Sequence, residues 1–124
     1  MNVFDDVSGM EPLRIWDGVS ARTVHGEKAT LAHVELDPNG HVPEHRHEAE
    51  QLGVVIRGSL TFRVGDETKE LGPGATWCIP SQVPHEAWAG AEGAILLEFF
   101  SPRRADWDGV GRDEPRPPRW PTAD

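Results

Sequence analysis

Glycine and proline interrupt this chain so often that little room is left for helices. The sequence holds 13 glycines and 11 prolines in 124 residues, and the short segments between them alternate between apolar and polar side chains. In the segment 59–64, for example, Leu60, Phe62 and Val64 fall on one face, and the polar residues fall on the other. Alternation with period two predicts β-strands, and many short strands must close on themselves to bury one face and protect their edges. We therefore predict an all-β fold, a small antiparallel barrel or jelly roll.

The expected strands occupy the middle of the chain: 29–36, 51–56, 59–64, 77–79, 86–89 and 94–100. Turn chemistry separates them at 37–40, at Arg57-Gly58, at Gly65-Asp66 and at 71–74. A chain of 124 residues has room for one hydrophobic core. We expect a single domain with three parts: an N-terminal arm at 1–19, which could hold a short edge strand or a dimer contact; the barrel at 20–100; and a proline-rich tail at 101–124, wrapped on the surface or disordered.

Charge and composition exclude several classes of protein. The net charge is −9, from 21 acidic and 12 basic side chains, and such a chain repels a phosphate backbone, so nucleic acid is not expected as a partner. No apolar run approaches the length of about 18 residues that a membrane helix needs. The N-terminus lacks the basic and apolar stretches of a secretory signal, which predicts a cytoplasmic protein. The single cysteine, Cys78, excludes an internal disulfide framework.

Three histidines and a glutamine have the spacing of a metal site. His45 and His47 are separated by one residue, so on an extended strand both side chains point to the same face. Gln51 follows four residues later, and a curled sheet would bring His85 to the same point. A His-x-His pair alone often binds no metal, but the four-part pattern predicts a divalent transition metal: zinc, nickel, manganese, iron or copper. His25, His33 and His41 have no partner at ligand spacing and are expected to be surface or rim residues.

The motifs around these residues resemble those of the cupins, small β-barrels in which two short motifs supply a metal site. The first motif corresponds to Gly40, His45, His47, Gln51 and Gly58, and the second to Gly74, Pro80 and His85. The resemblance covers roughly residues 29–100 and implies a cupin jelly-roll barrel with His45, His47, Gln51 and His85 as metal ligands. The chain departs from the pattern in three ways. The spacer after Gly40 is one residue short, Gln51 replaces the usual glutamate, and Gln82 and Ala89 stand where a glycine and an asparagine are usual.

The segment 98–107 is similar to the ending of the pectin-degradation cupins of the KdgF type, which are unsaturated uronate lyases. Matching by position implies that Glu98, Phe100 and Arg104 are catalytic residues of the pocket. Glu98 also stands out without the family, because alternation places this carboxylate on one face with Leu96 and Phe100, where it is costly unless paired or functional. The alternative is that Glu98 points outward or pairs with an arginine such as Arg63.

These residues predict an enzyme whose metal binds the oxygens of a small, anionic substrate. The resemblance implies ring opening or tautomerisation of a 4,5-unsaturated uronate to its linear keto form, with Arg104 pairing with the carboxylate and Glu98 moving the proton. Two other classes stay open: an iron or nickel dioxygenase, and a non-catalytic module that binds a small molecule through the metal.

We also expect a homodimer. A barrel of this size has exposed edge strands, and five tryptophans are many for so small a core. The N-terminal arm and the proline-rich tail are candidates for covering those edges.

Overall fold

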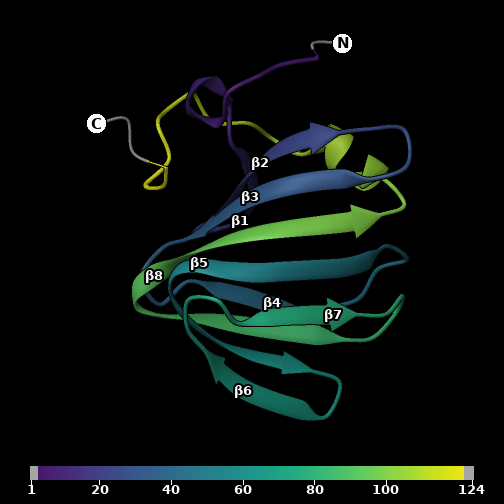
Figure 1. Cartoon of the computed structure of the whole chain (residues 1–124), viewed down its shortest axis with the longest axis vertical. Coiled ribbons are helices and arrows are strands. Elements are labelled where there is room, and N and C mark those ends of the chain that lie inside the picture. Colours follow the sequence, from purple (N-terminus) through teal and green to yellow (C-terminus); the bar gives the residue numbers. More distant parts are fainter. Residues whose placement is uncertain (1–2, 122–124) are drawn as a thin grey trace.

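The computed structural model describes residues 3–121 and shows a curled antiparallel sheet (Figure 1). Its strands are β1 (Leu13–Trp16), β2 (Val19–His25), β3 (Thr30–Leu36), β4 (His41–His45), β5 (Glu50–Val64), β6 (Glu67–Leu71), β7 (Thr76–Ile79) and β8 (His85–Ser101). Two short 3-10 helices, η1 (Val7–Gly9) and η2 (Ala105–Gly109), flank them. The predicted all-β fold of the jelly-roll type is confirmed. Within the described range, no helix is both long and apolar enough to cross a membrane.

Two long strands, β5 and β8, belong to both layers of the barrel. The second half of β8 pairs with β3 and with the first half of β5, and β7 extends this layer beyond β5. The first half of β8 pairs with β4 and with the second half of β5, and β6 continues that layer. The long strands therefore fold one sheet over on itself, and the inward faces of both halves are available to build a cavity.

The prediction of a turn at Arg57-Gly58 is wrong, and so is the prediction that 86–100 is divided into two strands. Both segments continue as single strands with irregular register near Gly58 and Gly93. The two glycines have φ of 78°, and a Cβ at Gly58 would lie 2.1 Å from the carbonyl oxygen of Gly93. Glycine is therefore needed because two backbones pass in close contact where both strands bend, and not because the chain reverses.

The turn at 71–74 does not form the expected hairpin between its flanking strands. β6 and β7 both pair with β5, so residues 71–74 carry the chain from one part of β5 to another. The turns at 37–40 and at Gly65-Asp66 are present as expected.

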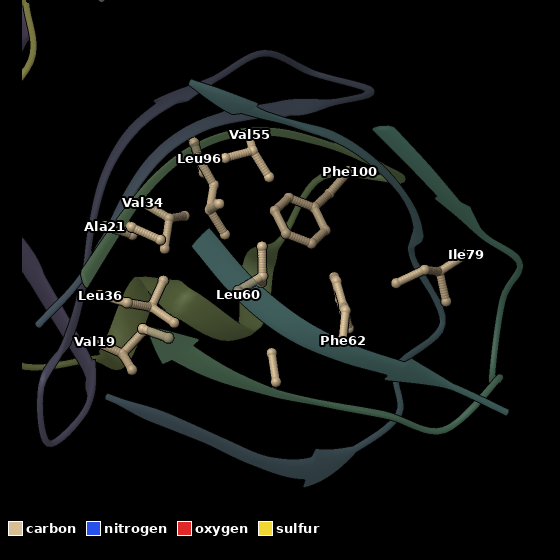
Figure 2. Close-up of a cluster of buried hydrophobic side chains, with 14 of the residues drawn as sticks. Val19, Ala21, Val34, Leu36, Val55, Leu60, Phe62, Ile79, Leu96 and Phe100 are labelled. Atoms are coloured by element: carbon tan, nitrogen blue, oxygen red, sulfur yellow. The ribbon is translucent and has the colours of Figure 1, made fainter. Parts of the chain in front are cut away.

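The core lies between the two layers (Figure 2). Leu60 and Phe62 of β5 point inward, as the alternation in 59–64 predicts, and are 2% and 6% exposed. They face residues such as Val34 and Leu96 from the opposite layer. Burial of these apolar side chains is the main stabilising contribution to the closed sheet.

The two ends of the chain pack against the barrel. β1 pairs with β2, which bears out the short edge strand among the possibilities for residues 1–19. The tail, yellow in Figure 1, runs back past β1, β2 and β3. His33 was expected at the surface, but it is only 3% exposed, because its ring stacks with Trp120 and its Nε2 lies 2.5 Å from the Trp120 carbonyl oxygen. The expectation of a wrapped tail therefore holds as far as residue 121.

Candidate metal centre

Three histidines meet at one end of the barrel. His45 is the last residue of β4, His47 lies in the connection to β5, and His85 is the first residue of β8. One ring nitrogen from each lies within 4.8 Å of the other two. Although His47 lies just beyond the strand, the predicted convergence of these side chains is present.

Each histidine uses its Nδ1 for a hydrogen bond to a carbonyl oxygen two residues away. The bonds run from His45 to Pro43 at 2.8 Å, from His47 to Ala49 at 2.8 Å, and from His85 to Val83 at 2.9 Å. A carbonyl oxygen only accepts, so each Nδ1 carries the proton and each Nε2 keeps its lone pair. Hydrogen bonds of this kind fix the ring orientation of metal-binding histidines.

Burial keeps the three imidazoles neutral. It lowers the pKa of His45 and of His47, and the charge of Arg104 acts in the same direction. At His85 burial lowers the pKa to about 4, even though the bond to the Val83 carbonyl raises it. Neutral imidazole is the form that coordinates a metal, so at physiological pH no proton has to be displaced from these ligands.

Two features of the site are unfavourable unless a cation is bound there. The Nε2 of His85 is buried and has no hydrogen-bond partner. The Nε2 of His47 lies 3.0 Å from the amide oxygen of Gln51, and both atoms are acceptors once the His47 proton is on Nδ1. A divalent ion bound by both atoms would remove this repulsion. The donor set of three imidazole nitrogens and one amide oxygen therefore fits a first-row transition metal such as zinc, nickel, manganese, iron or copper.

The Glu98 carboxyl lies behind Gln51, inside the barrel. The side-chain amide of Gln51 and the indole N–H of Trp77 both donate to its Oε2, the indole at 3.3 Å. Burial raises the pKa of Glu98 to about 7, although these two hydrogen bonds and the charge of Arg104 lower it. The inward position predicted by alternation is thus observed. Pairing with Arg63 is not, because the Arg63 guanidinium bonds to Glu44 and Glu86.

Arg104 and Phe100 lie together on the side of the cavity formed by the start of the tail. The Arg104 guanidinium carbon is 4.7 Å from the ring centre of Phe100 and 4.2 Å from that of Trp107. Asp106 accepts two hydrogen bonds from it, at 3.0 and 2.9 Å. The guanidinium is therefore fixed in place, and part of its hydrogen-bonding capacity is already used.

The cavity joins the predicted metal ligands to the predicted catalytic residues. Its lining includes His45, Gln51, His85, Glu98 and Arg104, and His47, which is not part of the lining, contacts Gln51. The centres of water molecules have about 50 Å³ available, which is several times the space of one water. The remaining lining is apolar: Ile15, Trp16, Val19, Val34, Leu36, Val42, Leu60, Phe62, Ala87, Leu96, Phe100 and Trp107.

The sequence did not single out Trp77, Asp106 or Trp107 as site residues. Trp77 reaches Glu98 from a strand that is distant in the sequence, so no local pattern connects them. Asp106 and Trp107 do have a local signal, because they follow Arg104 by two and three residues and can close a turn around its side chain.

Comparison with known proteins gives the family. Solved structures with the same fold include an RmlC-like cupin from Shewanella frigidimarina, which is 24% identical with a TM-score of 0.80 over 86% of this chain and 96% of that chain. KdgF from Halomonas sp. is 24% identical with a TM-score of 0.78 over 86% and 98%. The polyketide cyclase RemF from Streptomyces resistomycificus is 24% identical with a TM-score of 0.72 over 84% and 82%. The sequence model of the cupin domain family matches residues 32–100 of this chain, which is more than half of it. The chain therefore belongs to the cupin domain family.

Proposed function

We propose that this protein is a metal-dependent enzyme that acts on a small, oxygen-rich acid. The proposed reaction is the opening of a 4,5-unsaturated uronate ring to the linear keto form. His45, His47, Gln51 and His85 would hold the ion, and a divalent ion bound by four neutral ligands supplies Lewis acidity toward substrate oxygens. KdgF and RemF share the fold, which supports an enzyme on this scaffold.

The reaction needs proton movement and no oxidant. A proton leaves the hydroxyl on the hemiacetal carbon, the bond from that carbon to the ring oxygen breaks, and an aldehyde and an enol result. The enol then takes a proton on carbon, gives up the proton on its oxygen and becomes the ketone. The product is an isomer of the substrate, so a group that holds and returns a proton is sufficient.

The geometry of Glu98 is the observation that carries this proposal. Its Oε2 already accepts two hydrogen bonds, so a proton on the carboxyl belongs on Oε1. Glu98 lines the cavity, and its pKa of about 7 suits a group that both gives and takes a proton near neutral pH.

Arg104 would bind the substrate carboxylate. Asp106 uses the Nε and one Nη of the guanidinium, which leaves the other Nη to donate to a ligand. The guanidinium lies over the rings of both Phe100 and Trp107, and these contacts hold it in a defined position. An anionic substrate would thus be oriented between Arg104 and the metal ligands.

The loss of ultraviolet absorbance of the unsaturated uronate tests the proposal. Protein with its metal restored should accelerate the loss well beyond the spontaneous rate. An unchanged rate with every divalent metal tried would reject the uronate reaction. Oxygen consumption with candidate substrates would point instead to the dioxygenase class, and ligand-induced thermal stabilisation without turnover would point to a binding module.

The apolar cavity wall favours a second candidate, an acid–base cyclisation or isomerisation of a larger and less polar oxygenated substrate. Beyond the metal ligands, Glu98 and Arg104, every residue that lines the cavity is apolar, whereas a sugar offers hydroxyls on all sides. The same proton-transfer residues would serve both reactions. Competition for the metal-loaded site between a uronate and an aromatic hydroxy-ketone separates the two candidates.

A further inference from the structure

Trp77, Gly53 and Glu98 form a row across three neighbouring strands. Gly53 of β5 is in register with Trp77 of β7 on one side and with Glu98 of β8 on the other. Adjacent strands are about 4.8 Å apart, so the Trp77 side chain must cross the whole of β5 to reach Glu98. It does so, because its Nε1 lies 3.3 Å from Glu98 Oε2.

The absence of a side chain at Gly53 makes this contact possible. A Cβ there would lie 2.3 Å from Cε2 and Cζ2 of the Trp77 indole and 2.5 Å from its Nε1. Gly53 does not have the positive φ of Gly58, so its backbone conformation does not require glycine. The ring is held from another side by Phe62, whose centroid is 5.2 Å away at an interplanar angle of 68°.

This row determines which end of the Gln51 amide faces the histidines. An indole N–H can only donate, so the oxygen of Glu98 that it meets is an acceptor. The Gln51 nitrogen bonds to that same oxygen, and the Gln51 oxygen must then point the other way, toward His47 Nε2 at 3.0 Å. A glutamine in the opposite orientation would present an NH₂ group to the metal, and that group cannot coordinate.

We propose that Trp77, seated on Gly53, is a positioning residue that acts through Glu98 to hold the Gln51 amide oxygen toward the metal. This inference rests on the proposed metal site, since it assigns Trp77 a role in ligand orientation. Trp77 is neither one of the proposed metal ligands nor one of the residues that line the cavity. Residues that orient metal ligands in this way typically change metal affinity about 10- to 100-fold when they are replaced.

Trp77→Phe tests the proposal, because it keeps an aromatic ring over Gly53 and removes the N–H. Zinc affinity, measured by competition with a chromogenic chelator, should fall about tenfold or more. The absorption spectrum of the Co²⁺-loaded variant should also differ from that of the wild type, which a loss of packing alone would not cause. The matched control is Trp88→Phe, because Trp88 is partly exposed and stacks on His41 outside the site. It should bind zinc as the wild type does.

Gln51→Glu supplies the sharper control. A carboxylate presents an oxygen at either end, so its orientation does not depend on Glu98, and adding Trp77→Phe to this background should change zinc affinity little. If Trp77 acts through Gln51, the effects of the two substitutions on zinc affinity should not add. An equal loss of zinc affinity from Trp77→Phe in the wild-type and in the Gln51→Glu background would therefore overturn the proposal.

A readout on the wild type guards against misfolding of the variants. In proton–nitrogen NMR spectra the indole N–H signal of Trp77 should shift when zinc is added, while that of Trp88 should not. A Trp77 signal that does not shift when zinc is added would reject the inference. A folded Trp77→Phe protein that binds zinc with wild-type affinity would also reject it. If the wild type itself binds no metal, the proposed function fails first, and this result is distinct from a failure confined to Trp77.

Discussion

Glu98 is the residue at which catalysis and simple binding diverge. Glu98→Gln keeps an oxygen that can accept from both Gln51 and Trp77, so the contacts that orient the metal ligands can survive. Metal content and melting temperature should therefore stay close to those of the wild type. Turnover should fall about 100-fold or more, in line with the usual contribution of general acid–base catalysis. Measuring all three quantities side by side checks the role, and near-normal turnover would remove Glu98 from the mechanism.

At the scale of single residues, the sequence could predict what depends on local spacing. The convergence of His45 and His47 was predicted from their separation by one residue, although His47 lies just beyond β4, and the inward position of Glu98 follows from alternation along an apolar strand. The contact between Trp77 and Glu98 could not be predicted, because it depends on the register of β7 and β8 on β5. A register of this kind is set by pairing between segments that are distant in the chain.

At the scale of elements, the bends of β5 and β8 show where local patterns are ambiguous. Arg57-Gly58 has the composition of a turn, yet the strand continues, because glycine serves equally for a reversal and for a close approach of two backbones. What decides between them is the neighbouring strand, whose Gly93 oxygen occupies the space that a side chain at position 58 would need.

Gly58→Ala should therefore destabilise the protein strongly. The added methyl group would clash with β8, and the φ of 78° at this position is unfavourable for alanine. The free energy of unfolding should fall by about 2 kcal/mol or more, as measured by chemical denaturation. Gly72→Ala is the control, since a Cβ at Gly72 meets no atom within 4 Å, and it should have little effect. Equal stabilities of the two variants would contradict this account of the bend.

The tail is held to the barrel by a buried carboxylate. Glu35 bonds to Arg22 at 2.8 Å and to Arg119 at 3.0 Å, and Arg22 also donates to the carbonyl oxygen of Arg116 at 2.9 Å. Burial alone would raise the pKa of Glu35, but the hydrogen bonds from Arg119 and the charge of Arg22 outweigh it and hold the pKa below 4.5. A carboxyl whose pKa is lower in the folded protein than in the unfolded chain stabilises the fold at pH values above its ordinary pKa. This contribution is lost as the pH falls through the lower pKa of the folded state.

Glu35→Gln should remove this contribution at all pH values. It leaves the guanidinium of Arg22, whose side chain is 0% exposed, without its counter-charge, and losing one partner of a buried pair costs about 3 kcal/mol. Thermal unfolding followed from pH 7 to pH 3 should show a smaller acid-induced loss of stability in the variant. Glu67→Gln, in an exposed pair with Lys69, should behave as the wild type. If thermal stability changes with pH in the same way in the variant and in the wild type, Glu35 does not hold the tail on the barrel.

At the scale of the whole molecule, the outer face of the barrel carries an uncharged row that suits a second copy of the chain. Val24, Leu31, Phe99, Leu52 and Cys78 are successive cross-strand neighbours on β2, β3, β8, β5 and β7. Val24 and Phe99 are 50% exposed and Leu52 is 43% exposed. In a chain with a net charge of −9, two copies meet with least repulsion where charge is absent. The homodimer remains a prediction, and this row is our candidate for its interface.

Sedimentation of the wild type at tens of micromolar should show the dimer, and Phe99→Asp should convert it to a monomer by placing a charge in the row. Phe4→Asp is the matched control, because Phe4 is 89% exposed on the N-terminal arm. A monomeric wild type would reject the dimer. If Phe4→Asp is monomeric and Phe99→Asp is not, the dimer interface lies on the N-terminal arm.

The proposed chemistry and the role of Trp77 both depend on the metal centre. Elemental analysis of the wild type and of His47→Ala, each dialysed after exposure to divalent metals, tests whether this centre binds a metal. We expect one transition-metal ion per chain in the wild type and none in the variant, since the loss of one of four ligands leaves the site open. A folded wild type that retains no metal would contradict the claim, and so would a His47→Ala protein that retains a full equivalent.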